Sequence, residues 1–249
     1  MLEYRNTQRE KARIADLIKL FPSEGIENAL DIGARDGFFS MLLAERYSRV
    51  TALDLDKPDI RHNKIECVQG NVIALDFNNE SYDLVFCAEV LEHIPSTKLQ
   101  TACSEISRIS RQYLIIGVPY KQDIRMGRTT CYTCGQKNPP WGHVNVFDEK
   151  RLQELFPDYE PLEWSYVGVA EAGTNTISRL LMDWAGNPYG TYAQDEPCIY
   201  CANPLVYPPK RNFLQKISTK LASTIQRGQK LFLKPHPNWI HVLFKKTRI

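Results

Sequence analysis

The stretch Asn28–Asp54, NALDIGARDGFFSMLLAERYSRVTALD, carries the pattern that decides the fold. It begins with a short apolar strand at 28–32, passes through a glycine turn at 33–37 and continues as a helical run at 38–47. A second apolar strand follows at 50–53. This order predicts a β-turn-α-β unit in which the two strands are parallel neighbours.

The chain on either side extends this alternation. An amphipathic helix is expected over 5–21, because apolar residues recur there at helical spacing before Pro22. Strands alternating with helices predict an α/β fold with a doubly wound, mostly parallel sheet that binds its ligand at the carboxyl ends of the strands. Further strands are expected at 65–68, 82–88 and 113–118, and further helices at 97–111 and 147–156.

Two carboxylates flank the glycine turn and indicate a nucleoside cofactor. Asp54 ends the second strand 21 residues after Gly33, where an acid can accept both ribose hydroxyls. Asp31 lies just before the turn, where it would repel the pyrophosphate of a dinucleotide. The turn also has the spacing G-x-x-x-G rather than G-x-G-x-x-G. S-adenosylmethionine (SAM) has no phosphate and carries two positive groups, so it suits this pocket.

Four motifs in order resemble those of the class I SAM-dependent methyltransferase superfamily. LDIGARDG is similar to its first motif, TALDLD to its second and QGNV to its third, and YDLVFCAEVLEHIP is similar to the segment around the fourth strand. The resemblance covers roughly residues 25–165 and implies a Rossmann-like methyltransferase that uses SAM. EVLEH and GHVNVF resemble segments of a branch that includes small-molecule and cell-envelope glycan methyltransferases.

The resemblance also implies cofactor contacts, residue by residue. Arg35 departs from it, since a glycine is usual there; its side chain either pairs with the methionine carboxylate or points to solvent. The implied contacts are Asp31, Gly33, Ala34 and Gly37 around the methionine part, Asp54 on the ribose, Leu55 against the adenine, Asn71 and Val72 at the adenine edge, and Ala88 and Glu89 below the sulfonium. Asn71 replaces a frequent aspartate, but its side-chain carbonyl can still accept from the adenine amino group.

A general base is needed only where the acceptor is a hydroxyl or a protonated amine. His143 in GHVNVF is the favoured candidate, because this segment resembles one that borders the acceptor pocket in related enzymes. A helix-capping role or a role beside the metal is the alternative for His143. His93, at the end of an apolar run, is more readily explained as structural.

Four of the seven cysteines form two CxxC pairs, Cys131 with Cys134 and Cys198 with Cys201. A two-residue gap aims two thiolates at one ion, so the pairs together predict a closed, structural four-cysteine zinc site. The 63 residues between the pairs exceed ordinary zinc-ribbon spacing, so the metal would join two distant segments. An iron site, a disulfide, a single redox pair or buried free thiols are the alternatives.

The sequence NPPW at 138–141 matches a motif of DNA adenine methyltransferases. In those enzymes the motif follows the fourth strand directly and meets a flipped base. Here AEVLEHIP occupies that place and NPPW comes about fifty residues later, so we interpret it as a loop.

Charge divides the chain into an acidic body and a basic tail. The net charge is +2, but the last acidic residue is Glu196 and ten basic residues follow it. Apolar residues recur at helical spacing over 211–227 and interleave with lysines beyond. A basic amphipathic segment suits an anionic membrane surface, while packing on the acidic body or binding to nucleic acid are the alternatives.

These features predict a SAM-binding domain at 1–185 with an irregular cysteine-containing loop at 119–146, a second cysteine segment at 186–209, and a basic helical extension at 210–249. The expected activity is methyl transfer from SAM to a small molecule or glycan, in one form lipid-linked at the membrane surface. An RNA or protein methyltransferase and a non-catalytic SAM-binding module are the alternatives. No apolar stretch reaches about 18 residues and the N-terminus is charged, so we expect a cytoplasmic protein, peripheral on the inner membrane face if the tail binds lipid.

Overall fold

The computed structural model describes residues 5–170 and 173–247 and divides the chain into two compact units. The first, here called the sheet unit, comprises Met1–Tyr120, Phe147–Gly168 and Pro237–Ile249. The second, the cysteine unit, comprises Lys121–Val146 and Val169–His236. These divisions fall elsewhere than the boundaries expected at 185 and 209. Arg248, one of the ten basic tail residues, lies outside the described residues.

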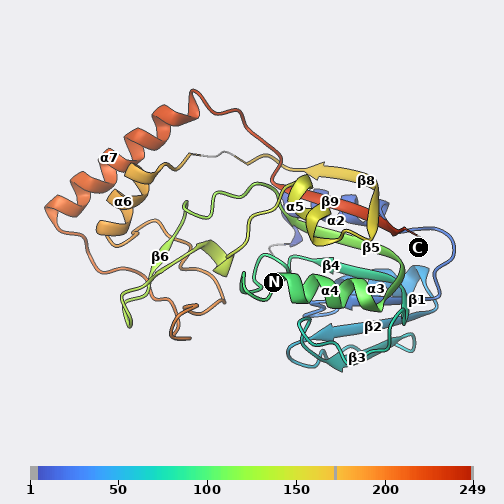
Figure 1. The fold of residues 1–249 in the computed structure, drawn as a ribbon. Coiled ribbons are helices and arrows are strands. Elements are labelled where there is room, and N and C mark those ends of the chain that lie inside the picture. Colours follow the sequence, from blue (N-terminus) through green and yellow to red (C-terminus); the bar gives the residue numbers. More distant parts are fainter. Residues whose placement is uncertain (1–4, 171–172, 248–249) are drawn as a thin grey trace. The chain divides into compact units, whose positions relative to one another are not determined.

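The sheet unit is built on seven strands in the order β3-β2-β1-β4-β5-β9-β8 (Figure 1). Neighbours among the first five strands are parallel, and β9 runs antiparallel to both β5 and β8. The expected Rossmann-like α/β fold is therefore confirmed, as a mixed sheet. The strands are β1 (Asn28–Ile32), β2 (Arg49–Asp54), β3 (Ile65–Gln69), β4 (Tyr82–Ala88), β5 (Ser110–Pro119), β8 (Tyr159–Val167) and β9 (Trp239–Lys246).

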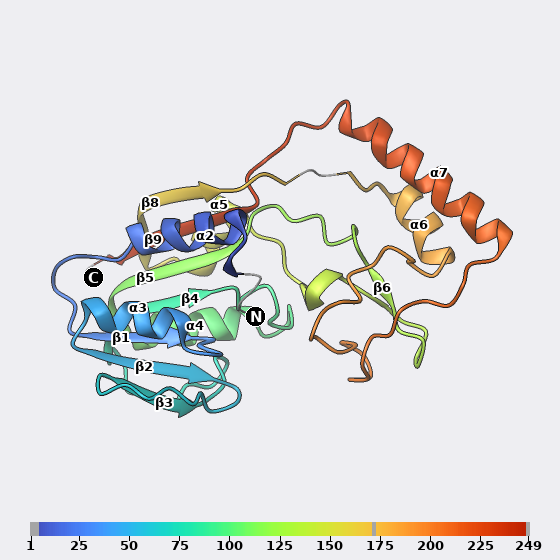
Figure 2. The same cartoon turned by 180° about the vertical axis from the view of Figure 1, so that it is seen from behind.

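Helices cover both faces of this sheet, which explains why β1 and β4 are apolar almost throughout. One core cluster packs α4 (Leu99–Ile109) and α5 (Glu149–Leu155) on one face. A second packs α2 (Gln8–Lys19) and α3 (Phe38–Arg46) on the other. Figure 1 views the sheet from the side of α4 and α5, and Figure 2 from the side of α2 and α3.

The C-terminal segment differs from the expected extension. Residues 239–246 form β9, which inserts between β5 and β8 in the sheet instead of continuing a basic helical tail. Local pattern misses this strand because its lysines lie at the end of the strand, while Ile240, Val242 and Phe244 alternate into the core and are fully buried. The expectation of an extension over 210–249 was thus wrong for its last part.

The cysteine unit contains little regular structure apart from two helices. α6 (Thr176–Trp184) and α7 (Phe213–Lys230) pack on each other, and β6 (Thr129–Thr130) pairs with β7 (Lys137–Asn138) ahead of a short 3₁₀ turn, η1 (Pro140–Gly142). The helix expected over 211–227 is present as α7, where the Asn212 side chain accepts a hydrogen bond from the Gln215 amide. No helix in the described parts of the chain is long and apolar enough to cross a membrane.

We expect β9 to be required for the stability of the whole sheet unit. Phe244 is fully buried with its ring 5.7 Å from those of Phe156 and Trp164, so Phe244→Ala should cost about 3–5 kcal/mol. Lys245→Ala, one position along on the exposed face, should change stability by less than about 0.5 kcal/mol. Urea unfolding of the two variants checks this; equal, small effects would mean that the segment is a dispensable tail.

Candidate cofactor site and cysteine cluster

The turn after β1 brings the chain close to β2 and needs glycine twice. Gly33 and Ala34 both donate their amide hydrogens to the carbonyl of Leu53, at 2.8 and 3.1 Å. Gly33 and Gly37 have φ of 81° and 79°, in the left-handed region that favours glycine. A Cβ on Gly33 would also lie 2.4 Å from a methyl of Val90. The conformation leaves the carboxyl ends of β1 and β2 side by side.

Asp31 is held out of water in this turn. Asp31 belongs to β1, where its backbone is paired with Ala52 of β2 on one side and Phe86 of β4 on the other. The residue is 2% exposed. Burial raises the pKa of its carboxyl to about 7, although the Ser40 hydroxyl donates to Oδ2 at 2.5 Å and opposes the shift. The Asp31 carboxyl is therefore partly protonated at neutral pH, and a cationic partner would stabilise its ionised form.

Asp54 is oriented by two backbone amides. Its Oδ2 accepts from the amide of Arg35 at 2.8 Å and its Oδ1 from the amide of Leu55 at 2.7 Å. Each oxygen keeps a further lone pair, which suits a carboxylate that binds a pair of ribose hydroxyls. Arg35 reaches this position with a φ of 47°, which explains why glycine is the usual residue there.

The side chains expected around the adenine differ in their availability. Leu55 is 63% exposed, which leaves its apolar surface open to a flat ring. Val72 is buried in the sheet unit's core. The Asn71 side-chain oxygen already accepts from the amide of Ile73 at 3.1 Å, so it closes a local turn. Its fit to an adenine amino group therefore depends on the second lone pair of that oxygen.

Glu89 follows Ala88 at the end of β4 in a left-handed conformation, with φ of 58°. Its amide donates to the carbonyl of Gly117 at 2.9 Å, and its Oε2 accepts from the Trp239 indole at 3.2 Å. Its Oε1 is buried without a hydrogen-bond partner among the residues that the structure describes. Burial raises the pKa of Glu89. A residue with a strained backbone and an incompletely hydrogen-bonded carboxyl is suited to receiving a ligand group.

Sequence reasoning missed two of the residues that support these carboxyls. Ser40 lies on the first turns of α3, and its small polar side chain inside an apolar helix was the available signal. Trp239 comes from β9, which was not expected as a strand, so no local pattern connects it with Glu89.

A surface hollow of about 390 Å³ lies at the amino ends of the parallel strands. It is lined by the first residues of four parallel strands, Asn28, Arg49, Ile65 and Tyr82. Because ligands of doubly wound sheets bind at the carboxyl ends, this hollow is separate from the candidate cofactor site.

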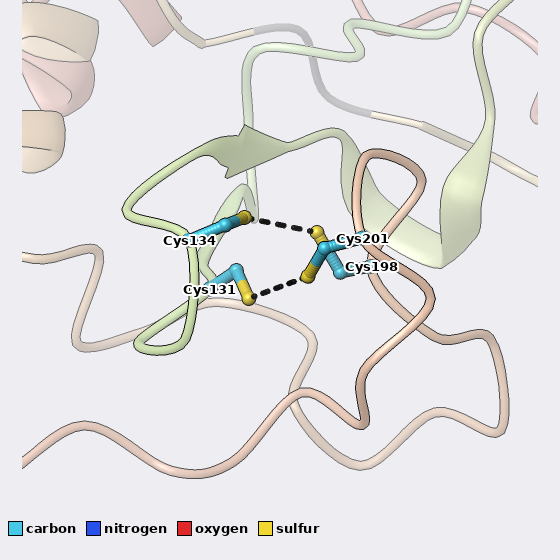
Figure 3. Close-up of side chains that lie close together, drawn as sticks. All are labelled: Cys131, Cys134, Cys198 and Cys201. Carbon is cyan, nitrogen blue, oxygen red and sulfur yellow. Dashed lines mark hydrogen bonds between the residues drawn. The ribbon is translucent and has the colours of Figure 1, made fainter.

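The four cysteines of the CxxC pairs converge within the cysteine unit (Figure 3). The Sγ atoms of Cys131 and Cys201 are 3.7 Å apart, those of Cys134 and Cys198 are 3.6 Å apart, and all four lie within 4.8 Å of one another. A tetrahedral ion with Zn–S bonds of about 2.3 Å places its sulfurs about 3.8 Å apart. The sulfurs are too far apart for disulfides, which require about 2.05 Å.

The two pairs have the same backbone structure. In each, the residue after the second cysteine donates its amide to the carbonyl of the first cysteine at 2.8 Å; these residues are Gly135 and Ala202. Both adopt positive φ, 76° and 57°. Amide hydrogens of Cys134 and Thr133 point at the Cys131 sulfur and lower the pKa of its thiol to about 6. Such turns present thiolates together, as a metal requires.

The NPPW segment links the two cysteine pairs. Asn138 is fully buried in β7, and its side-chain oxygen accepts from the amide of Ile199, between Cys198 and Cys201, at 2.9 Å. This contact gives Asn138 a structural role that has nothing to do with a flipped base.

His143 also belongs to the cysteine unit, directly after η1. It is 8% exposed, and its Nδ1 lies 2.6 Å from the Oε1 of Gln122. This contact fixes the orientation of the ring and gives Nδ1 the proton, which leaves Nε2 as the nitrogen with basic character. Its part in catalysis stays a prediction.

Comparison with known proteins agrees with the arrangement of the carboxyl ends. Residues 30–115 match the family model of a methyltransferase domain, a stretch that contains the end of β1, all of β2, β3 and β4, and the residues around Asp31 and Asp54. Residues 30–115 therefore form a methyltransferase domain of the class I SAM-dependent superfamily. The resemblance that the four motifs carry is therefore confirmed for this stretch, and the family implies SAM as the cofactor.

Among curated proteins, this methyltransferase domain is similar to a ubiquinone biosynthesis O-methyltransferase of Idiomarina loihiensis, with 30% identity over 91 residues. An uncharacterized methyltransferase of Mycobacterium bovis is 30% identical over 89 residues. The matches cover 32% and 33% of this chain and 37% and 44% of those proteins. The chain thus spans less than half the length of these curated relatives.

Among solved structures, the N-methyltransferase NodS of Bradyrhizobium japonicum, in complex with S-adenosylhomocysteine, has a TM-score of 0.56 at 16% identity. The alignment covers 99% of this chain and 91% of NodS. At this identity the likeness concerns the fold alone, which agrees with the Rossmann-like assignment.

Binding of SAM should release a proton from Asp31. The carboxyl pKa of about 7 means that it is mostly protonated at pH 6, and a nearby cation favours the charged form. We expect about 0.9 proton released per SAM bound at pH 6 and about 0.1 at pH 8. Calorimetry in buffers of different ionisation enthalpy measures this, with Asp31→Asn as the control that should release none. Equal release at the two pH values would contradict the assignment.

Proposed function

We propose that this chain transfers a methyl group from SAM to a small-molecule or glycan acceptor. The observation that carries the proposal is the buried Asp31 carboxyl beside the glycine turn, with Asp54 on the neighbouring strand. Negative charge at this place favours a sulfonium nucleoside and disfavours a phosphorylated one. Membership of the superfamily supports the same cofactor.

In this proposal each strand end has one task in binding. Asp31 and the turn formed by Gly33, Ala34 and Gly37 border the methionine part, and Asp54 binds the ribose. Bound SAM supplies a methyl group on a positively charged sulfur, open to in-line attack. The chain's contribution is then mainly to orient the two reactants and exclude water. The remaining proposed contacts are Leu55, Asn71 and Val72 at the adenine, and Ala88 and Glu89 below the sulfonium.

The acceptor class rests on the neighbours. The ubiquinone biosynthesis enzyme and NodS are named as an O-methyltransferase and an N-methyltransferase, and a third structure of similar fold is a methyltransferase with 1,6-didemethyltoxoflavin and S-adenosylhomocysteine bound. A small-molecule acceptor is therefore preferred to RNA or protein, and a glycan, in one form lipid-linked, is added because EVLEH and GHVNVF resemble segments of glycan methyltransferases.

Cofactor selection is tested by Asp54. We expect binding of S-adenosylhomocysteine without detectable binding of NADH at millimolar concentration. Asp54→Ala should weaken S-adenosylhomocysteine at least tenfold, because an amide-oriented carboxylate that binds two hydroxyls is lost. Asp76→Ala, which removes an exposed carboxylate in the loop after β3, should not change affinity. Tight uptake of NADH by the unchanged protein would refute the proposed cofactor.

The acceptor is tested with SAM carrying a labelled methyl group. The labelled cofactor and the protein are added to a cell lysate, which is then separated into lipid, small-molecule, RNA and protein pools. Label in the lipid or small-molecule pool is expected. Label in RNA or protein would replace the proposed acceptor class, and label in no pool, from protein that binds SAM, would indicate a binding module.

His143 is the proposed general base, where the acceptor requires one. His143→Ala should lower turnover far more than SAM affinity, because a base acts in the reaction and not on the cofactor. His143→Asn keeps a polar group but no base and should be equally slow. An unchanged rate would exclude His143 from the mechanism.

We propose further that Cys131, Cys134, Cys198 and Cys201 hold a structural zinc ion. Cysteine would occupy all four coordination positions of the ion, which leaves none open for catalysis. The role of the ion would therefore be structural, joining two segments that contain little regular secondary structure. The protein as purified should contain about one zinc. Cys131→Ser should lose it, whereas Cys67→Ser, in β3, should keep it. Less than about a tenth of an equivalent of zinc or iron in the unchanged protein would reject the site.

Removal of the metal should loosen the cysteine unit first. Because a thiolate site stabilises the folded form of the segments it joins, chelation should increase proteolysis within 121–146 and 169–236 before it affects the sheet unit. Cleavage mapped by mass spectrometry checks this order.

A further inference from the structure

Helix α7 is packed with its polar side inward. Ser218, Thr219 and Ala222 are buried, whereas Phe213, Leu214, Ile217 and Leu221 are between 49% and 75% exposed. The usual amphipathic helix of a globular protein has the opposite arrangement, with the apolar side against the core. The apolar side of α7 is therefore left facing solvent.

Hydrogen bonds hold α7 in this orientation. The Ser218 hydroxyl donates to the carbonyl of Leu181 in α6 at 2.9 Å. The guanidinium of Arg211 donates to the Thr219 hydroxyl at 2.7 Å and to the Tyr189 hydroxyl at 3.0 Å. Turning α7 so that its apolar side faced inward would break these bonds.

The neighbouring helix repeats the pattern. Ile177, Leu180 and Trp184 of α6 are spaced three and four residues apart, so they form one stripe, and each is more than half exposed. Ser178, on the other side of α6, is fully buried. Two adjacent helices thus expose large apolar side chains, which we call the hairpin surface: Ile177, Leu180, Trp184, Phe213, Leu214, Ile217 and Leu221.

Positive charge accompanies this surface. Lys216 and Lys220 of α7 are exposed, and Lys210, Arg211 and Lys216 line a hollow of about 400 Å³ at the start of the helix. No acidic residue follows Glu196 in the sequence. Asp183 of α6 is paired at 3.0 Å with both Arg128 and Arg179, so it does not offset the lysines of α7.

We propose that the hairpin surface docks on a lipid bilayer with anionic headgroups. Apolar side chains in this arrangement enter the boundary between headgroups and acyl chains, while the flanking lysines meet lipid phosphates. A second copy that docked through this same surface would bring the same positive charge against it. The inference does not depend on methyl transfer, since it concerns a surface of the cysteine unit and is measured without the cofactor.

The test is co-sedimentation of the full chain with vesicles of neutral phosphatidylcholine, with or without a third of anionic phosphatidylglycerol. We expect binding to the anionic vesicles, weakened by salt. The double variant Lys216→Ala/Lys220→Ala should lose about 25-fold in affinity, about fivefold for each lysine. Lys150→Ala, an exposed lysine of α5, should change nothing.

The apolar contribution is tested separately. Leu214→Ser/Ile217→Ser should lower vesicle affinity at least tenfold without loss of stability, because both side chains are exposed in the folded protein. The matched control is Leu162→Ser, an exposed leucine of β8. S-adenosylhomocysteine binding is measured on the same samples, so failure of docking and failure of the proposed function are told apart.

Three results would overturn the proposal. The first is that the unchanged protein stays in the supernatant when anionic vesicles are sedimented at low salt. The second is that the serine variant binds as well as the unchanged protein. The third is sedimentation equilibrium showing a dimer that the serine variant abolishes, which would make the hairpin surface an interface between two copies.

Discussion

The candidate cofactor site depends on one carboxyl group that the fold keeps away from water. Raising the pKa of Asp31 from 3.8 to about 7 means that the folded state pays for ionising it. The cost is absent below pH 4, grows as the pH rises and reaches about 4 kcal/mol above pH 7. Without the hydrogen bond from the Ser40 hydroxyl, which opposes the shift, the cost would be larger. A cationic ligand would offset it, so the buried charge links stability to binding.

The strand β9 determines the other half of this site and much of the sheet unit's interior. Because β9 inserts between β5 and β8, the Trp239 indole can donate to the Glu89 carboxylate, and the His241 side chain contacts α2. The Nδ1 of His241 lies 2.6 Å from Asp16 of α2, and burial lowers the pKa of the ring despite that carboxylate. On the inner face of α2, Glu10 and Arg13 are buried beside Leu17 as an ion pair.

The cysteine unit follows a different physical principle from the sheet unit. It has few strands, and large apolar side chains of its helices lie outside, so burial of apolar surface contributes less to its stability. Cross-links between distant segments take on more of that task. The four thiols and the contact of Asn138 with Ile199 join residues more than 60 positions apart. Because contacts between distant segments stabilise this unit, an apolar helix face can remain exposed.

Sequence alone determined the parts of this protein that depend on local periodicity and on short motifs. The alternation of strands and helices, the glycines at 33 and 37 and the acids at 31 and 54 sufficed for the fold and for the family, because backbone geometry restricts which residues those positions accept. The pairing of the two CxxC motifs also followed from their spacing. The four sulfurs do converge, although the sequence left open what they bind.

Tertiary structure alone decided what depends on partners far away in the chain. A lysine-rich segment became β9 because its alternate residues found a core between β5 and β8. Asn71, expected to face adenine, also accepts a hydrogen bond from the Ile73 amide through its side-chain oxygen. The burial of Asp31, and with it the shifted pKa, requires strands on both sides. The direction in which α7 faces was equally hidden, since helical periodicity identifies an apolar side but not whether that side is covered.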